Sequence, residues 1–342
     1  MIGESVSALD SIRNLLQVEI VRVAGCTEPA SVAFAFLTAR RHLKGPFDPR
    51  TATARLVASR EVLRNAATAV VPFLNRRGLR TVVAAGLSSR ARGFNLFPGV
   101  DPRVTRILLA RRNWLTIGPP AREKGVYVRA VLCTPRESVS VIIAGRHDEV
   151  RSIDRNGRNV FRAVARRELR LGMAEIMRLA MKRDRQLESI ARNFLVRQVR
   201  GNLNRPMPKR VAELIRARMC GSPAAIMTVV GSGNHGILLG VPLYELYRER
   251  GPRVLPAVVV SLLTVIHMTQ QRSRISDACG LATKAAPALA AGFAFLRGAS
   301  LEQIRRAMDS AARELRGLKC HGARASCGGK AQKVLSVVMN RL

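Results

Sequence analysis

Apolar residues recur at helical spacing over most of the chain. This spacing predicts an amphipathic helix over residues 5–23, and an Ala-rich run capped by Thr27 predicts a second helix to about residue 42. Beyond residue 160, Gly and Pro divide a long stretch of the same pattern into further helices. These predicted helices cover roughly residues 161–183, 186–199, 208–219, 235–249, 254–271, 276–297, 301–316 and 324–341.

The middle of the chain has a different pattern. Residues 126–133 and 138–144 are β-rich runs joined by a hairpin-like connection, and a short strand and a turn follow over residues 150–157. Residues 50–97 are harder to assign. We therefore predict an α+β protein. A predominantly helical catalytic core, formed by residues 1–98 and 161–342, is interrupted by a small α/β insert at residues 99–160.

One apolar segment raises the question of a membrane. The run from Val254 to Thr269 contains Pro256 and is shorter than the ~18–20 residues that usually span a bilayer. We expect a buried core helix there and no membrane partner. The N-terminus has no basic region before an apolar core, and six cysteines are too few for a disulfide scaffold in a chain this long. The expected location is the cytoplasm.

The charge balance is strongly basic, with 58 Lys and Arg against 23 Asp and Glu and a net charge of +35. Such a surface attracts polyanions. The basic residues are nevertheless spread over every segment, and aromatic residues make up only 4% of the chain. Arginine-biased codon usage explains the charge equally well. A specific nucleic-acid partner is therefore not expected, although a basic nucleic-acid-associated protein stays an alternative.

Four of the six cysteines occur at predicted helix starts or in glycine-rich loops. Cys320 and Cys327 flank a loop with glycines on both sides, Cys279 follows a predicted N-cap at Ser276, and Cys26 directly precedes a helix. Backbone N–H groups in such turns can bond to sulfur, and a helix N-terminus favours a thiolate. Packing residues are the plainer interpretation of each cysteine alone. Together, their wide spacing favours an iron–sulfur cluster over zinc.

A second loop, residues 231–236, joins an apolar segment to a predicted helix. Its N–H groups and Asn234 could hold a carboxylate at the helix N-terminus, although a tight turn would have the same sequence. His147, His235 and His321 are candidate polar residues of a site.

These segments are arranged in the order and spacing of a known family. The chain resembles the L-cysteine desulfidases, relatives of the iron–sulfur L-serine dehydratase alpha chain, over nearly its full length. The matching segments are Gly25–Pro29, Asn65-Ala66, Gly145 with His147, Gly231–Ile237, Ser276–Gly280 and Cys320–Cys327.

The resemblance implies a [4Fe–4S] cluster held by Cys279, Cys320 and Cys327, with one iron open to act as a Lewis acid. It makes Cys26 either a fourth ligand at rest or the base that takes the substrate's α-proton, a role that a lowered pKa would suit. β-Elimination would then release sulfide from L-cysteine, or water from L-serine, and yield pyruvate and ammonia. The residues that would orient this small amino acid are Ser232, Asn234, His147 and Asn65.

The sequence also departs from the family pattern. Residues 69–76 lack the family's glycines, and bulky Val71, Phe73 and Leu74 are expected to close part of the substrate pocket. His321 stands where an aspartate is usual, and Leu281 replaces a small residue or cysteine. A degenerate cluster-binding protein with a redox or regulatory role and little activity is therefore the main alternative to a lyase. Self-association into a homo-oligomer is left open.

Overall fold

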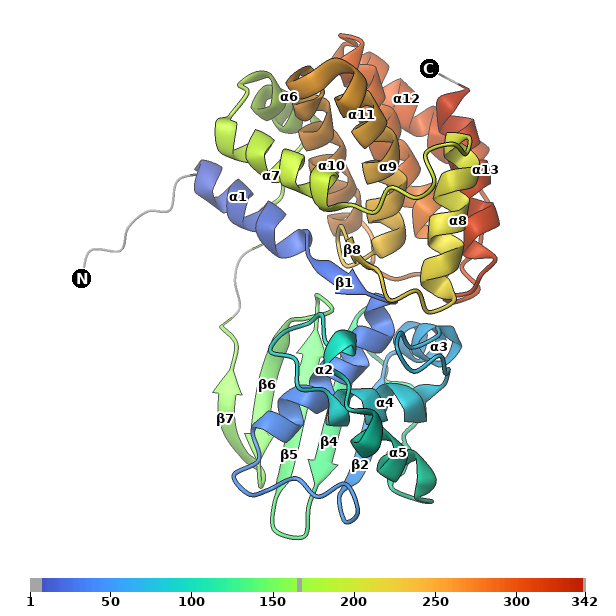
Figure 1. Cartoon of the computed structure of the whole chain (residues 1–342). Coiled ribbons are helices and arrows are strands. Elements are labelled where there is room, and N and C mark those ends of the chain that lie inside the picture. Colours follow the sequence, from blue (N-terminus) through green and yellow to red (C-terminus); the bar gives the residue numbers. More distant parts are fainter. Residues whose placement is uncertain (1–7, 165–167, 341–342) are drawn as a thin grey trace, which may run out of the picture.

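Two lobes, each with its own hydrophobic core, make up the protein (Figure 1). The computed structural model describes residues 8–164 and 168–340. One lobe is built on a β-sheet and the other consists of helices. The α+β fold class expected from the sequence is confirmed.

The sheet lobe contains a six-stranded mixed sheet of order β3-β2-β4-β5-β6-β7, in which β2 and β3 are parallel and the other neighbours are antiparallel. Its inward-facing positions alternate with partly exposed ones, which explains why these segments form strands. Helix α2 lies against β4 and β5. The strands are Thr53–Ala58, Leu115–Ile117, Tyr127–Cys133, Ser138–Ala144, Val150–Arg155 and Arg158–Arg162 for β2 to β7, and the helices are Thr27–Arg41, Arg60–Thr68, Leu79–Ser88 and Pro102–Ala110 for α2 to α5.

The helical lobe packs around α10 and α11, whose side chains are almost all buried. A short π-helix, Leu281–Ala285, leads directly into α11. The helices of this lobe are Ala8–Glu19 (α1), Met173–Met181 (α6), Arg185–Arg197 (α7), Met207–Met219 (α8), Gly233–Arg250 (α9), Leu255–Gln270 (α10), Ala286–Leu296 (α11), Leu301–Glu314 (α12) and Cys327–Met339 (α13). Short 3₁₀ turns occupy Phe97–Gly99 and Gly251–Val254.

The division of the chain differs from the predicted boundaries at residues 98/99 and 160/161. Helices α2, α3 and α4 pack with the sheet rather than with the helical core, whereas α1 joins the helical lobe. Strand β2 was not predicted because its alternation is short and includes Arg55. It pairs with β4 along its whole length, and this draws residues 27–98 into the sheet lobe. The helix predicted over residues 161–183 is shorter: residues 161 and 162 belong to β7, residues 165–167 lie outside the described part of the chain, and α6 begins at Met173.

Within the described residues, one apolar helical run, Gly233–Gln270, is long and apolar enough to cross a membrane. Of its most apolar stretch of 18 residues, however, 78% is buried inside the protein. It consists of α9 and α10, separated at Gly251 by a φ of 65°. The expectation of a buried core helix at residues 254–269 is confirmed by α10.

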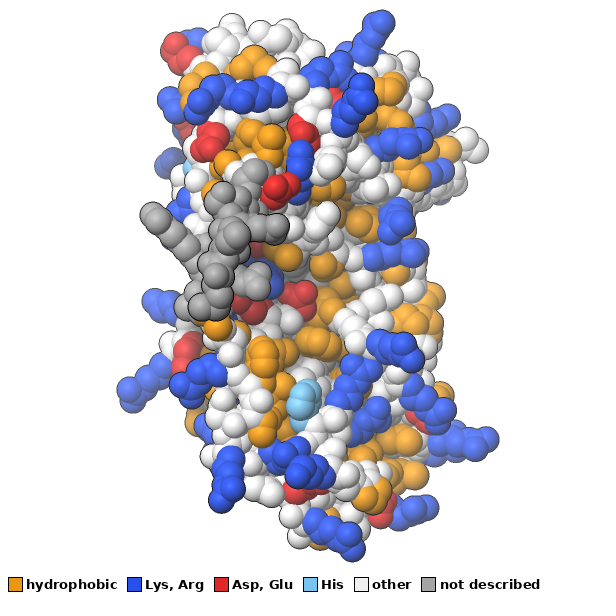
Figure 2. Space-filling view, turned by 90° about the vertical axis from the view of Figure 1, so that its left-hand side faces the viewer, with side chains coloured by type: hydrophobic (Ala, Val, Ile, Leu, Met, Phe, Trp, Pro, Cys, Tyr) orange, Lys and Arg blue, Asp and Glu red, His pale blue; other side chains and the backbone are white. Residues whose placement is uncertain are grey.

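The basic side chains are spread over both lobes. On the face displayed in Figure 2, Lys and Arg side chains occur from one end of the molecule to the other and alternate with hydrophobic and neutral patches. The dispersed layout expected from the sequence is therefore present on this face of the folded protein.

A two-stranded antiparallel ladder joins the lobes. It pairs β1 (Arg22–Ala24) with β8 (Ala225–Met227) and continues through the bond from the Val230 amide to the Glu19 carbonyl, at 2.9 Å. Helix α2 begins just after β1, and α9 begins a few residues after β8. The ladder therefore places the starts of two helices at the junction of the lobes.

We predict that Gly86→Ala will destabilise the sheet lobe, because a Cβ atom there would lie 2.2 Å from the Ala33 carbonyl oxygen of α2. Overpacking of this kind costs about 1–3 kcal/mol. The apparent melting temperature should fall by several degrees in a thermal scan. Gly329→Ala is the matched control, since Gly329 is also helical but its Cβ would meet open space. That variant should keep or slightly raise the melting temperature, and equal losses in both would contradict the close α2–α4 packing.

Candidate active site

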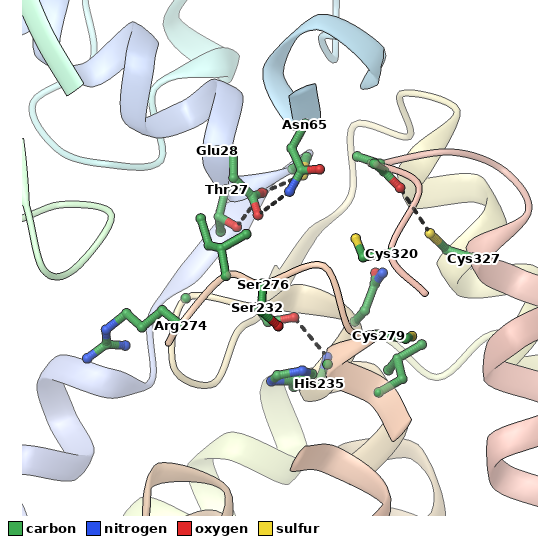
Figure 3. Close-up of a pocket in the computed structure, with 18 of the residues that line it drawn as sticks. Thr27, Glu28, Asn65, Ser232, His235, Arg274, Ser276, Cys279, Cys320 and Cys327 are labelled. Carbon is green, nitrogen blue, oxygen red and sulfur yellow. Dashed lines mark hydrogen bonds between the residues drawn. The ribbon is translucent and has the colours of Figure 1, made fainter. Parts of the chain in front are cut away.

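A cavity of about 110 Å³ lies where the lobes meet (Figure 3). Its wall comes from both lobes: the start of α2, α3 and the β5–β6 turn on one side, and the end of α8, the start of α9, residues 274–284 and the loop before α13 on the other. Segments distant in sequence thus share one small space.

The eight residues for which the sequence predicts a role as base, ligand or substrate-binding group all line this cavity, as do the two further candidates, His235 and His321. Figure 3 shows Cys279, Cys320 and Cys327 toward the helical lobe and Thr27, Glu28 and Asn65 on the sheet-lobe side. The remaining cysteines, Cys133 and Cys220, are not among the lining residues. The eight are Cys26, Asn65, His147, Ser232, Asn234, Cys279, Cys320 and Cys327.

Glu28 is the centre of a hydrogen-bonded group at the start of α2. Its carboxylate accepts from the Cys26 thiol at 2.9 Å and from the Asn65 amide at 2.8 Å. Burial alone would raise the pKa of Glu28, but the neighbouring His147 imidazole and the hydrogen bonds from Cys26 and Asn65 lower it by more, so the net direction is down. Glu28 is therefore a carboxylate at neutral pH.

The environment of Cys26 corrects the expectation of a lowered pKa. Cys26, rather than Thr27, occupies the N-cap position of α2, and its side chain is buried. Burial raises the pKa of the Cys26 thiol well above its usual value, the negative charge of Glu28 raises it further, and the Arg218 charge only partly offsets this. The sequence suggested only the helix dipole, whereas desolvation and a neighbouring carboxylate dominate in the folded protein.

Two buried histidines pack against glycines. A Cβ atom on Gly231 would lie 2.1 Å from Nδ1 of His147, and one on Gly280 would lie 2.7 Å from Nε2 of His235. Burial lowers the pKa of His147 to about 4, with Glu28 opposing the change, and lowers that of His235 to about 3. Both rings are neutral at physiological pH. Neither nitrogen of His147 has a hydrogen-bond partner within the described residues.

Cations that the sequence did not single out also line the cavity. Arg274 donates to Glu19 at 2.7 Å, and Lys284 donates to the carbonyl oxygens of Ser273 and Arg274 at 2.6 and 3.0 Å. Burial lowers the pKa of Lys284 to about 8, and the charges of Arg274 and Arg272 lower it in the same direction. The other two are Arg218 and Lys330. No local sequence signal distinguishes these residues from the other basic side chains.

Comparison with known proteins identifies the family. The family model described as serine dehydratase alpha chain matches residues 121–339, almost two thirds of the chain. The chain belongs to the serine dehydratase alpha chain family. The matched region contains His147, Ser232, Asn234 and the three cavity cysteines of the helical lobe, whereas Cys26, Glu28 and Asn65 lie outside it. The fold brings this second group to the cavity. The family places the protein among enzymes of the lyase type.

Curated relatives extend the similarity to most of the chain. A UPF0597 protein of Clostridium perfringens is 25% identical, with 92% of this chain and 83% of the relative covered. UPF0597 proteins of Thermosipho melanesiensis, at 22% identity with 90% and 82% covered, and of Methanocella arvoryzae, at 26% with 92% and 83% covered, are similar. The similarity includes the N-terminal segment that the family model leaves out.

In this serine dehydratase alpha chain family member, backbone hydrogen bonds join the two segments that carry Cys279 and Cys320, and the third cavity cysteine of the helical lobe, Cys327, starts a helix. The Cys279 amide donates to the Leu318 carbonyl at 2.8 Å, the Cys320 amide donates to the Asp277 carbonyl at 2.6 Å, and Cys327 begins α13. All three are free cysteines.

Three free thiols on one cavity wall are of the ligand type that an iron–sulfur cluster takes. Among residues 8–164 and 168–340, no three His, Cys, Asp or Glu side chains are grouped closely enough to hold one metal ion. Thiolates on one zinc ion must converge at Zn–S distances of about 2.3 Å. A [4Fe–4S] cluster presents a different iron to each thiolate, so its ligands lie farther apart. Three free thiols around one cavity fit this group.

Contacts between the lobes hold the thiol-bearing loops in place. Arg64 of α3 forms an ion pair with Asp277 at 2.7 Å, and the Ala323 amide donates to the Thr68 hydroxyl at 3.1 Å. Asp277 lies two residues before Cys279, and Ala323 lies three residues after Cys320. The two contacts therefore tie the cysteine-bearing loops to α3 of the sheet lobe.

The expected closure of the pocket by residues 69–76 is contradicted. None of Val71, Phe73 and Leu74 is among the residues that line the cavity within the described chain. Val71 is buried in the core of the sheet lobe, and Phe73 is 50% exposed at a φ of 66°. Pro72, in the same loop, packs against Gly25. The other two departures from the family pattern, His321 and Leu281, do line the cavity.

We predict that Glu28→Gln will increase the alkylation rate of Cys26. Removal of the carboxylate charge lowers the pKa of the thiol, so more thiolate is present at a fixed pH. The measurement is iodoacetamide labelling of iron-free protein at pH 7.5, followed by peptide mass spectrometry, with exposed Cys220 as the internal reference. The Cys26 to Cys220 rate ratio should rise severalfold. An unchanged or smaller ratio would show that the Glu28 carboxylate does not raise the pKa of the Cys26 thiol.

Proposed function

We propose that this protein is a [4Fe–4S]-dependent lyase that carries out β-elimination on L-cysteine, with L-serine deamination as a second reaction of the same site. L-Cysteine and water would give pyruvate, ammonia and hydrogen sulfide. The observation that carries the proposal is the arrangement of one cavity: the Cys26–Glu28 pair lines one part of it, and three free thiols line another.

In this proposal Cys279, Cys320 and Cys327 hold the cluster, and Cys26 serves as base rather than as a fourth ligand. When bound, the cluster would supply Lewis acidity for the leaving thiol or hydroxyl group. Burial raises the pKa of the Cys279 thiol, and the backbone N–H groups of Ala282 and Leu281 and the charge of Lys330, which also lies on the cavity wall, offset this only in part. A cation here favours the thiolate form that a metal ligand requires.

Proton abstraction would use the pair at the start of α2. At rest the proton stays on the Cys26 sulfur, because burial and Glu28 raise the pKa of the thiol. The ammonium group of a bound amino acid would add a positive charge nearby and favour the thiolate. Glu28, already hydrogen-bonded to the thiol at 2.9 Å, is placed to accept the proton. The Cys26 thiolate would then remove the substrate's α-proton.

The polar groups around the pair would orient the substrate. Asn65 donates to Glu28 through its amide nitrogen, and its carbonyl oxygen has no partner among the described residues, so it can accept from an ammonium group. Neutral His147 has two unpartnered ring nitrogens. Ser232 and Asn234 lie at the first turn of α9, where backbone N–H groups favour a negatively charged group.

Anaerobic reconstitution with iron and sulfide should give a brown protein that forms pyruvate from L-cysteine. Sulfide should appear in equal amount, because each elimination releases one sulfide for one pyruvate. Pyruvate from L-serine would be assayed in parallel. A brown protein with no turnover on either amino acid would support the degenerate cluster-binding alternative. A protein that binds no cluster would refute both.

Cys320→Ser should abolish the cluster absorbance, since it removes one of three proposed ligands. Cys26→Ser should keep the cluster and lower kcat by a factor of about 10²–10⁴, the usual contribution of a positioned base. Cys133→Ser and Cys220→Ser are the matched controls, because neither side chain lines the cavity, and both should keep cluster and turnover. Normal turnover of the Cys26→Ser protein would refute its role as base.

A further inference from the structure

Arg218, near the end of α8, is a buried arginine without an acidic partner. Its side chain is 4% exposed and lines the cavity. One terminal nitrogen, Nη1, donates to the side-chain oxygen of Asn234 at 2.9 Å. Nε and Nη2 have no hydrogen-bond partner, and no carboxylate of the described residues lies within ion-pair distance of the guanidinium. The Nε–Nη2 edge of the side chain is therefore unsatisfied.

Helix α8 contains a second buried arginine, Arg210, which does have an acidic partner and so serves as a comparison. Arg210 is 3% exposed and forms an ion pair with Glu245 at 3.1 Å. It is not part of the cavity wall. A buried charge without a partner is costly, so buried charges in proteins are normally paired. Of two equally buried arginines on α8, the one that faces the cavity lacks its anion.

The surroundings of Arg218 add to the positive potential. A Cβ atom on Gly233 would lie 2.5 Å from Nε of Arg218, so the guanidinium rests directly on the first residue of α9. This 18-residue helix directs the positive end of its dipole at the same point, and the Ser232 hydroxyl accepts from the His235 amide at 3.3 Å. An anion that bound here would meet both a guanidinium and a helix N-terminus.

We propose that Arg218 binds the α-carboxylate of the amino-acid substrate through its Nε–Nη2 edge, with the first turn of α9 as the second half of the site. The planar edge of a guanidinium matches the two oxygens of a carboxylate. A cavity of about 110 Å³ suits a small ligand. This inference rests on the proposed function, and it adds a residue outside the set that the sequence suggested.

The position of Arg218 relative to the proposed base is consistent with this role. Arg218, Cys26 and the two buried histidines, His147 and His235, all line the same cavity. A carboxylate held by Arg218 would therefore keep the α-carbon of the substrate beside the Cys26 thiol. The site should accept amino acids with a free carboxylate and reject their amides.

L-Alanine and L-alaninamide allow this binding to be measured without turnover, because neither has a leaving group. Calorimetric titration would use full-length cluster-loaded protein and, in parallel, the iron-free protein. The wild type should bind L-alanine at least about tenfold tighter than L-alaninamide, since hydrogen bonds to charged groups contribute on that scale. Arg218→Gln should remove this preference and raise KM for L-cysteine about ten- to a hundredfold, with a smaller effect on kcat. Arg218→Lys keeps the positive charge but not the planar pair of N–H donors, so it should lose part of the preference for L-alanine over L-alaninamide.

Arg210→Gln is the matched control for loss of a buried arginine from α8. It should lower the melting temperature and keep the preference for L-alanine. Unchanged L-alanine binding in Arg218→Gln, or no preference in the wild type, would overturn the inference. Pyruvate formation with normal KM in Arg218→Gln would refute the inference and leave the lyase standing. Arg218-dependent binding without turnover in the wild type would support the carboxylate site and refute the lyase.

Discussion

The short β1–β8 ladder is the constraint on which the rest of the site depends. It pairs residues about 200 positions apart, Arg22 with Met227 and Ala24 with Ala225, and so fixes where α2 and α9 begin. Close packing leaves little freedom at this point, because a Cβ on Gly236 would lie 1.8 Å from the Met227 carbonyl oxygen. Each helix therefore presents its N-terminal end, with unsatisfied N–H groups, to one cavity.

Much of the fold could be predicted from periodicity, because long helices with a buried face repeat their pattern over many residues. Helices α8 to α13 begin and end within a few residues of expectation, except at the N-terminus of α11, where an irregular segment and a π-helix follow the predicted start at residue 276. The layout of the lobes could not be predicted in this way. Strand β2 has only six residues, and its place between β3 and β4 depends on partners 60 to 80 positions away.

The site was predictable where its chemistry is rare in the sequence. Cysteines are few, so four of them in glycine-rich or helix-start positions stand out, and the fold brings all four to one cavity. Arg218 and Lys284 could not be found in this way because they are two of 58 basic residues. What distinguishes them is a buried position on the cavity wall, which only the folded protein shows. The pKa of Cys26 was mispredicted for a related reason: the helix start is visible in the sequence, but desolvation and the orientation of Glu28 are not.

The charge of the cavity explains why these buried groups belong together. Its wall carries Arg218, Arg274, Lys284 and Lys330 but, among the described residues, only one acid, Glu28. Arg274 is compensated by Glu19 from outside the wall, and Lys284 by backbone carbonyl oxygens. The remaining positive charge is expensive to bury unless anions enter the site. A cluster with three thiolates and a substrate carboxylate are both anionic. The excess positive charge that destabilises the empty cavity would therefore stabilise the cavity with cluster and substrate bound. The basic residues on the protein surface are not needed for this effect.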